Sequence, residues 1–95
     1  MKLTQNLTVS NKAGFHLRVA SMICKEAMKY EDEITLANGS YKADCKSCLD
    51  LLAIMAPCGT TLSLEVEGEH SETIASVFTE MFEKKFWEDE YSKTE

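Results

Sequence analysis

Hydrophobic and polar positions alternate in two segments of the chain, and each alternation predicts a strand with one buried and one solvent-exposed face. In residues 2–10 the apolar positions that share one side are Leu3, Leu7 and Val9. Gln5 is the polar exception on that side. In residues 60–67 the apolar positions on one side are Leu62, Leu64 and Val66. Strands with one polar face favour an antiparallel sheet that is covered on one side only.

Two shorter segments, 33–37 and 40–45, predict a hairpin because Asn38-Gly39 separates them. Asn and Gly tolerate the positive φ angles of a tight turn, so this pair between short alternating runs is a strong hairpin signal. Together with the two segments above, the hairpin gives four predicted strands.

Three further segments show the helical spacing of apolar residues. The first, 17–30, has a stripe formed by Ala20, Ile23, Cys24 and Ala27. The second, 47–55, has an inner stripe formed by Leu51, Ile54 and Met55. The third, 71–87, has a stripe formed by Ile74, Val77, Phe78, Met81, Phe82 and Phe86. The order βαββαβα predicts an α+β fold, an open-faced β-sandwich in which three helices cover one face of a four-stranded antiparallel sheet.

The length and charge of the chain limit what it can be. A chain of 95 residues has room for one core, so we expect a single domain over residues 1–88 and a charged C-terminal tail over 89–95. The net charge of −6, from 16 acidic and 10 basic residues, argues against binding to nucleic acid or an anionic membrane. The sequence has neither an 18-residue apolar run nor the pattern of a secretory signal, so we expect a cytoplasmic protein.

The first and last predicted helices differ in the charges at their ends. The last helix has Glu72 near its start and Lys84 and Lys85 near its end, as the helix dipole favours. The first helix has no acidic residue from Leu17 to Lys25, and a cation, Arg18, lies in its first turn. This reversal indicates that the start of the first helix is kept available for an anion.

The stretch AGFHLRVAS brings a glycine loop, His16 and Arg18 together at that helix start. The backbone N–H groups of Leu17 and Arg18 are candidates to bind phosphate, and the Arg18 guanidinium suits phosphate oxygens. A neutral imidazole beside such donors can accept a phosphoryl group and pass it on. From residue types alone, a partly buried loop histidine and a solvated arginine are an equally good interpretation.

Four cysteines, Cys24, Cys45, Cys48 and Cys58, allow two interpretations. The CxxC spacing of Cys45 and Cys48 fits a metal or redox site, but the other two cysteines do not form a second pair of ligands. The alternative, which we favour, is that all four are small apolar residues in a reducing compartment and bind no metal. His70 is interpreted as a surface or capping residue of the last helix.

The segment after Lys46 also allows two interpretations. The pattern Ser47-Cys48-Leu49-Asp50 is typical of a helix N-cap, and a phosphate on Ser47 would meet Asp50 at close range. If the inner stripe is buried, Cys48, Leu49 and Leu52 remain for the surface, where an apolar patch commonly marks a protein contact. The alternative is a segment that is wholly buried under the last helix.

The chain resembles the HPr family, the phosphocarrier proteins of the phosphoenolpyruvate-dependent sugar phosphotransferase system. The resemblance rests on AGFHLRVAS, which is similar to the family motif G-[ILF]-H-x-R-P-A, on KSCLDLLAIMAPCG, and on the order βαββαβα. It extends from about Leu3 to about Glu88. The fold that it implies is the open-faced sandwich already predicted from the hydrophobic pattern.

The resemblance implies a role for each motif. His16 matches the histidine that carries phosphate on its Nδ1 between enzyme I and IIA-type proteins, and Arg18 matches the arginine that contacts the phosphoryl group. Ser47 matches the serine that a serine kinase modifies in some members, which makes it a candidate regulatory phosphosite. The patch of Cys48, Leu49 and Leu52 matches the surface that enzyme I and the IIA proteins bind. We expect a monomeric, stoichiometric carrier with no cofactor, rather than an enzyme.

Three residues depart from the family pattern. Val19 stands where the family usually has Pro, and Asp50 and Met55 stand where many members have Gly. The last two lie beside the partner-binding surface, so two alternatives to sugar transport stay open. One is a regulatory, nitrogen-type relative that signals its phosphorylation state. The other is an interaction module that has lost transfer, although the joint presence of His16 and Arg18 argues against it.

Overall fold

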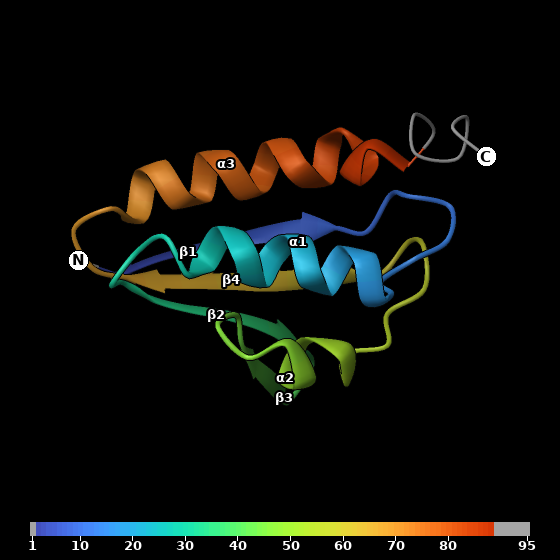
Figure 1. Ribbon diagram of the computed structural model, residues 1–95, viewed down its shortest axis with the longest axis horizontal. Coiled ribbons are helices and arrows are strands. Elements are labelled where there is room, and N and C mark those ends of the chain that lie inside the picture. The colour runs from blue at the N-terminus through green and yellow to red at the C-terminus, as the bar shows by residue number, and fades with distance from the viewer. Residues whose placement is uncertain (1, 89–95) are drawn as a thin grey trace.

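The computed structural model describes residues 2–88, and it shows one antiparallel sheet with helices on one of its faces (Figure 1). In chain order the elements are β1 (Lys2–Thr8), α1 (Leu17–Ala27), β2 (Glu33–Asn38), β3 (Tyr41–Asp44), α2 (Cys48–Leu52), β4 (Thr61–Glu67), α3 (Ser71–Glu83) and a short 3-10 segment, η1 (Lys85–Trp87). The strands lie in the order β1-β4-β2-β3. The predicted open-faced sandwich and the order βαββαβα are confirmed.

The central strand β4 carries the alternation that the sequence predicts. Leu62, Leu64 and Val66 are fully buried under the helices, and the residues between them are more exposed. The same three residues define the register, because Leu7 pairs with Leu62 on one side and Leu36 pairs with Leu64 on the other. A shift by one residue would turn this apolar row to solvent, so the hydrophobic pattern fixes the register.

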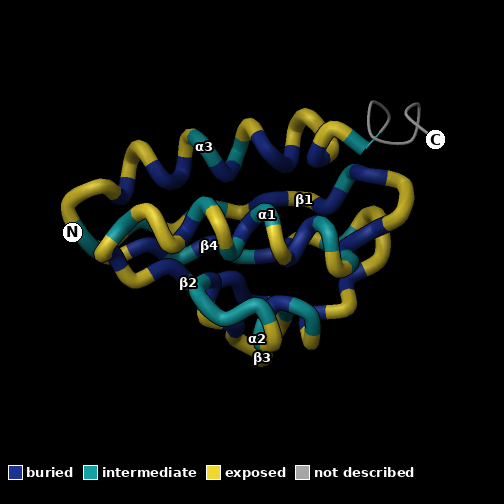
Figure 2. Tube along the Cα trace, in the orientation of Figure 1, coloured by how far each residue is buried: buried dark blue, intermediate teal, exposed yellow. Residues whose placement is uncertain are grey.

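The polar exception in β1 has a structural reason. Gln5 is half-buried on the helix-facing side, and its Nε2 donates a 2.6 Å hydrogen bond to the Thr79 Oγ1 of α3. Thr79 in turn donates to the Ala75 carbonyl at 2.7 Å, so the polar groups between β1 and α3 are paired. The buried positions of α3 lie on its side toward the sheet (Figure 2).

The predicted hairpin is confirmed. Strand β2 pairs with β3 as far as Asn38 and Tyr41, and the turn between them uses the positive φ of 62° at Gly39. The Asn38 side chain donates to the Ile54 carbonyl at 3.3 Å, so the hairpin also holds the chain that follows α2.

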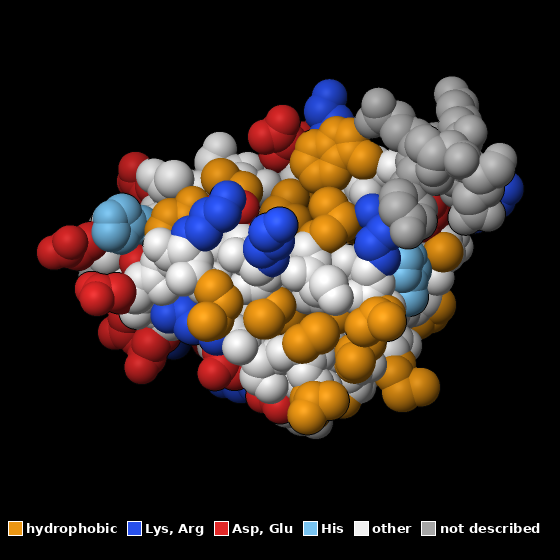
Figure 3. All heavy atoms as spheres, viewed as in Figure 1, with side chains coloured by type: hydrophobic (Ala, Val, Ile, Leu, Met, Phe, Trp, Pro, Cys, Tyr) orange, Lys and Arg blue, Asp and Glu red, His pale blue; other side chains and the backbone are white. Residues whose placement is uncertain are grey.

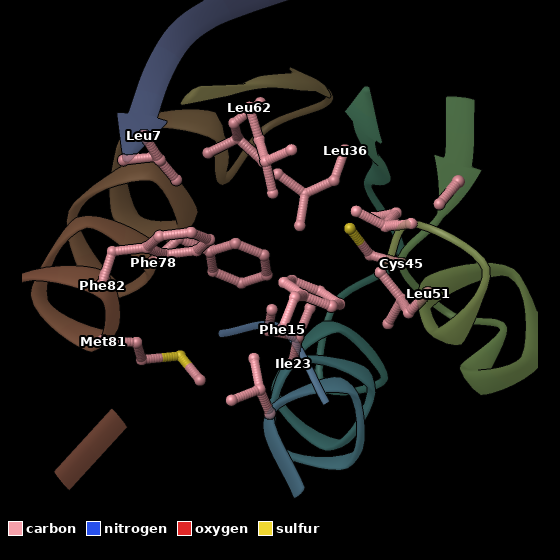
Figure 4. Close-up of a cluster of buried hydrophobic side chains, with 14 of the residues drawn as sticks. Leu7, Phe15, Ile23, Leu36, Cys45, Leu51, Leu62, Phe78, Met81 and Phe82 are labelled. Atoms are coloured by element: carbon pink, nitrogen blue, oxygen red, sulfur yellow. The ribbon is translucent and has the colours of Figure 1, made fainter. Parts of the chain in front are cut away.

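The core lies between the sheet and the helices and extends into the loop before α1. Figure 4 shows Phe15 from that loop in the same cluster as Ile23 of α1 and Phe78 of α3. Phe15 is 7% exposed, and Phe78 and Ile23 are fully buried. Burial of Phe15 therefore anchors the residue that directly precedes His16 to the core of the domain.

The predicted end of the last helix is wrong. Helix α3 ends at Glu83, and the chain then makes a left-handed turn with φ angles of 55°, 52° and 54° at Lys85, Phe86 and Trp87. The turn keeps Phe86 fully buried, with its ring edge-on to Phe82 at 4.9 Å between centroids. Consequently Lys84 and Lys85 follow α3 instead of lying near the end of a helix that continues to Trp87. The first helix likewise ends at Ala27 instead of residue 30.

A buried carboxylate holds the start of α3. Asp32 has a side chain that is only 2% exposed, and its two oxygens accept from the His70 backbone N–H at 2.8 Å and contact the His70 Nδ1 at 3.0 Å. Gly68 makes room for this pair, because a Cβ at that position would collide with the Asp32 carboxyl group. Burial by itself raises the pKa of Asp32, but the hydrogen bonds from the His70 ring and backbone outweigh it and lower that pKa.

We expect Asp32→Asn to destabilise the protein at neutral pH and to make its stability less sensitive to acid. A carboxyl group with a lowered pKa contributes fully above its unfolded value of about 3.9, and this contribution is lost as the pH falls below that value. Urea unfolding at pH 7 and at about pH 3.5 measures the effect. The difference between wild type and variant should be large at pH 7 and should shrink in acid.

The matched control for that experiment is Glu69→Gln, which removes a carboxylate from an exposed position next to His70. It should leave the unfolding free energy within about 0.5 kcal/mol of wild type at both pH values. A difference between wild type and Asp32→Asn that stays the same at the two pH values would contradict the role of the ionised Asp32 carboxylate.

Candidate functional site

The loop before α1 is held in place by backbone contacts with residues 56–58. Gly14 has a φ of 81°, and a Cβ there would lie 3.0 Å from the Ala56 carbonyl oxygen, so close approach and positive φ both require glycine. The next residue, Phe15, donates its N–H to the same Ala56 oxygen at 2.8 Å. From the other side, Asn11 Nδ2 donates to the Gly14 carbonyl at 2.7 Å. This bracing fixes the direction in which the chain enters α1.

His16 is the N-cap residue of α1, and its side chain makes no capping hydrogen bond. Its backbone is extended, with φ −128° and ψ −172°, and its carbonyl accepts the first helical hydrogen bond from the Ala20 N–H at 2.9 Å. The ring is 36% exposed. The first turn of α1 contains no acidic residue, and the neighbouring Leu17 is 62% exposed. The imidazole thus lies at an accessible helix N-terminus, where backbone N–H groups favour an anion.

Arg18 is half-buried, which differs from the interpretation of a solvated arginine. Its Nη1 donates to the Phe86 carbonyl oxygen at 2.8 Å and lies 3.1 Å from the Met22 Sδ. The carbonyl that it binds belongs to the left-handed turn after α3. The guanidinium is therefore held against the first turns of α1 by a segment from the other end of the chain.

The structure adds one residue that sequence reasoning missed. The Glu88 side chain is 15% exposed, and its Oε1 accepts from Asn11 Nδ2 at 3.0 Å and lies 4.0 Å from the His16 Nε2. The Ala13 N–H donates to both Glu88 oxygens at 3.2 Å. The hydrogen bond from Asn11 lowers the pKa of Glu88, and the backbone N–H groups of the loop and the nearby His16 act in the same direction against partial burial.

No sequence signal identifies Glu88, because its contacts span 75 and 77 residues. Glu88 is the last residue of the predicted domain, next to the charged tail expected over 89–95. That tail lies outside the described residues.

Ser47 and its neighbours form a short capped helix beside this site. The Ser47 Oγ accepts the Asp50 N–H at 3.2 Å, so the N-cap interpretation is confirmed. The apolar face is only partly as expected, since Leu51 and Ile54 are buried but Met55 is 78% exposed. Helix α2 ends at Leu52 instead of residue 55, and Met55 adopts a φ of 49° that turns it outward.

The predicted surface patch is present and larger than expected. Leu49 is 80% exposed and Cys48 and Leu52 are half-buried, so the segment is not wholly buried under the last helix. With Leu17 and Met55 these residues form what we call the α2 patch. Figure 3 shows hydrophobic side chains gathered over α2 and the start of α1. A group of exposed apolar side chains is typical of a protein contact, and that role of the patch stays a prediction.

The cysteines are free thiols in different surroundings. Cys45 is fully buried in the core, and burial raises the pKa of its thiol far above the usual range. Cys24 and Cys48 are half-buried and Cys58 is exposed. Within residues 2–88, no three His, Cys, Asp or Glu side chains are grouped so that they could hold a metal ion. In the same range, no helix is long and apolar enough to cross a membrane.

Comparisons with known proteins agree with this geometry. Residues 3–84 match the family model described as the PTS HPr component phosphorylation site. The chain belongs to the HPr family. A phosphocarrier protein HPr from Xylella fastidiosa is 30% identical over 87 residues, which cover 92% of this chain and 98% of that protein. A phosphocarrier protein NPr from Shewanella violacea is 31% identical over 90% of this chain and 93% of its own length.

A solved structure has the same fold. The crystal structure of HPr-C-His from Thermoanaerobacter tengcongensis superposes with a TM-score of 0.83 at 24% identity, covering 88% of this chain and 94% of that one. This HPr-family chain is thus a phosphocarrier-type component of the phosphotransferase system.

Two departures from the family pattern have physical explanations. Val19 stands in place of the usual Pro and is fully buried. Its side chain fills space in the core, whereas a proline at this position would make the helix start more rigid. Met55 lies in the left-handed region, where a glycine is free of strain and a side chain with a Cβ is not. Asp50 also has a local contact that Gly cannot make, because its Oδ2 accepts the Asp44 backbone N–H at 3.3 Å.

We expect Met55→Gly to raise the free energy of unfolding by about 1 kcal/mol, because it relieves the left-handed strain. Urea unfolding monitored by circular dichroism measures the change. The matched control is Ala53→Gly two residues earlier, at an exposed position with φ −72°, which should lower stability by about 0.5–1 kcal/mol. A destabilised Met55→Gly variant would contradict the strain at this position.

Proposed function

We propose that the protein is a cytoplasmic phosphocarrier that accepts a phosphoryl group on the Nδ1 of His16 from phosphorylated enzyme I and passes it to IIA-type proteins. The observation that carries the proposal is the position of His16. Its ring is exposed at a helix N-terminus, makes no capping bond and has no acidic residue in the adjoining turn. A dianionic phosphoryl group is stabilised there by backbone N–H groups and meets no side-chain carboxylate from that turn.

Leu17 and Arg18 supply the groups that hold the phosphoryl oxygens in this proposal. Their backbone N–H groups lie in the first turn of α1, where the helix has no earlier carbonyl to pair with them. The Arg18 side chain adds a positive charge beside that turn, and its hydrogen bond to the Phe86 carbonyl fixes where the charge lies. Fixed charges stabilise a transferring phosphoryl group without reorganisation during the reaction.

The α2 patch is the proposed docking surface for enzyme I and for the IIA-type acceptors. It includes the exposed Leu17, which directly follows His16, and we expect a partner seated on Leu49 and Leu52 to cover the ring during transfer. Apolar anchors at the centre of a contact supply most of its binding energy. We expect the carrier to act as a monomer without cofactor or metal.

A regulatory, nitrogen-type role is the second candidate within the same chemistry. It is favoured by the 31% identity to a phosphocarrier protein NPr and by Met55, which enlarges the patch where many HPr proteins have Gly. The arrangement at Ser47 gives less support to a regulatory serine kinase, since its Oγ already caps α2 and Asp50 lies on that cap.

We expect phosphoenolpyruvate and enzyme I to place an acid-labile phosphate on the wild-type chain and none on His16→Ala. The matched control is His70→Ala, which removes the other of the two histidines and should be phosphorylated like wild type. Mass spectrometry before and after mild acid measures the phosphate. Equal labelling of His16→Ala and wild type, or no labelling of wild type, would refute the carrier function.

The docking surface has its own test. We expect Leu49→Ala to lower kcat/KM for phosphorylation by enzyme I about tenfold, the loss typical of one apolar anchor. Its unfolding free energy should change little because the side chain is 80% exposed. Met28→Ala is the control, since Met28 is 64% exposed at the other end of α1 and should leave the kinetics unchanged. Similar kinetics for Leu49→Ala and Met28→Ala would place the docking surface elsewhere.

A further inference from the structure

Asn11 is a fully buried polar residue in the loop between β1 and α1. Its backbone carbonyl accepts the Gly14 N–H at 3.1 Å, and its side-chain Nδ2 donates to the Gly14 carbonyl at 2.7 Å. The same Nδ2 donates to the Glu88 Oε1 at 3.0 Å, where the chain that leaves α3 lies beside this loop (Figure 1). One buried side chain thus closes the turn over residues 11–14 and ties it to the other end of the domain.

The orientation of the Asn11 amide follows from its two neighbours. A backbone carbonyl and an ionised carboxylate only accept hydrogen bonds, so the NH₂ side of the amide has to face them. The opposite orientation would point Oδ1 at two oxygen atoms. Among the described residues Oδ1 has no hydrogen-bond partner, which is costly for a buried acceptor. The two bonds that the amide donates therefore decide how this side chain lies.

The Gly14 carbonyl and the Phe15 N–H belong to one peptide unit, and both of them are bonded. The carbonyl accepts from Asn11 Nδ2 at 2.7 Å, and the N–H donates to the Ala56 carbonyl at 2.8 Å. A trans peptide is planar, with its carbonyl and N–H on opposite sides, so bonds to both groups fix the plane of the whole unit. This clamped peptide lies one residue before His16.

Gly14 explains why a clamp is needed at this point. Its φ of 81° and its close approach to Ala56 favour glycine, but glycine also gives the peptide that follows it more rotational freedom than any other residue. A rotated peptide would take the Phe15 N–H away from Ala56 and shift the backbone that leads into α1. The Asn11 side chain opposes this rotation, because it holds the carbonyl on the other side of the same plane.

We infer that Asn11 is a positioning residue for phosphoryl transfer: its side-chain amide holds the Gly14–Phe15 peptide in one orientation and thereby fixes the His16 ring relative to the first N–H groups of α1. The inference rests on the proposed function. Asn11 does not touch the phosphoryl group and acts only through the backbone. Fixed donors stabilise a reacting group only where they are correctly placed, and a displacement of about 1 Å can slow a reaction about a hundredfold.

Gln5 provides a matched control, because it is a second side-chain amide that joins two parts of the fold. It is half-buried, and its Nε2 donates to the Thr79 Oγ1 at 2.6 Å, between β1 and α3. Neither residue of that pair lies in the loop before α1. Loss of the Gln5 or the Asn11 amide should lower the melting temperature, Tm, by about 5 °C. A difference in transfer between the two variants is then not explained by stability.

The kinetic test compares Asn11→Ala and Gln5→Ala with wild type as full 95-residue chains. Enzyme I and phosphoenolpyruvate phosphorylate each chain at a temperature well below its Tm. We expect kcat to fall roughly tenfold in Asn11→Ala with KM unchanged, because the α2 patch is not altered. Gln5→Ala should keep both wild-type values. A raised KM with an unchanged kcat, or equal losses in the two variants, would overturn the inference.

Hydrogen exchange measured by NMR reports on the clamped peptide itself. The Phe15 N–H is hydrogen-bonded beside a buried ring, so it should exchange slowly in wild type and in Gln5→Ala. In Asn11→Ala its exchange should be at least about tenfold faster, because the peptide is free to rotate. Equal protection of the Phe15 N–H in Asn11→Ala and Gln5→Ala would contradict the clamp.

Asn11 also bonds Glu88, and a double variant separates the two bonds. Glu88→Gln removes the charge and keeps a side-chain oxygen that can accept from Asn11. The fold loss in kcat caused by Asn11→Ala should be the same in that background as in wild type, because the bond to Gly14 does not involve Glu88. A loss that disappears in the Glu88→Gln background would refute positioning through Gly14.

The two proposals fail in distinguishable ways. If wild type gains no acid-labile phosphate, the carrier function fails and the positioning role of Asn11 fails with it. If wild type and Asn11→Ala are phosphorylated with the same kcat, only the positioning role fails.

Discussion

The hydrogen bond from the Phe15 N–H to the Ala56 carbonyl is the contact on which the site depends. Gly14 favours this bond, because a Cβ there would lie 3.0 Å from the same carbonyl oxygen and would crowd it, and the Phe15 ring beside the bond is buried. A backbone hydrogen bond in an apolar surrounding is costly to break, so the loop has little freedom. His16 follows Phe15 directly, so the same contact restricts the backbone of His16. Its exposure is therefore the result of an anchored neighbour and not of a flexible loop.

Local patterns were enough to predict the architecture but not all of the site. The alternation in β1 and β4, the Asn38-Gly39 turn and the position of His16 at a helix start each depend on residues within a few positions of one another. These predictions were correct because periodicity and turn chemistry are local effects. The end of α3 was predicted wrongly for the opposite reason. Phe86 fits the helical stripe equally well in a helix or in the left-handed turn, and long-range contacts decide between them.

The two histidines show why residue type and helix position do not assign a role. Both are N-cap residues, and neither side chain caps its own helix. His70 contacts a buried carboxylate through Nδ1 and secures α3, whereas His16 has a carboxylate 4.0 Å from Nε2 and a first turn free of acidic residues. In each case the partner carboxylate comes from a distant part of the chain, 38 residues away for Asp32.

The site therefore has two parts with different physical requirements. The proposed chemical part consists of a helix N-terminus, a braced loop and fixed charges, and displacing any of them by about 1 Å would weaken the stabilisation of a phosphoryl group. The proposed docking part consists of exposed side chains on α2 and Leu17, which can change without disturbing the core. Met55 is such a change, because its side chain adds apolar surface beside Leu49 at the cost of backbone strain. Val19 belongs to the chemical part. Its presence in place of Pro is accommodated because its side chain is buried in the core, and this burial keeps the helix start in place. In the proposed function, the docking surface can therefore change while the residues around His16 stay in place.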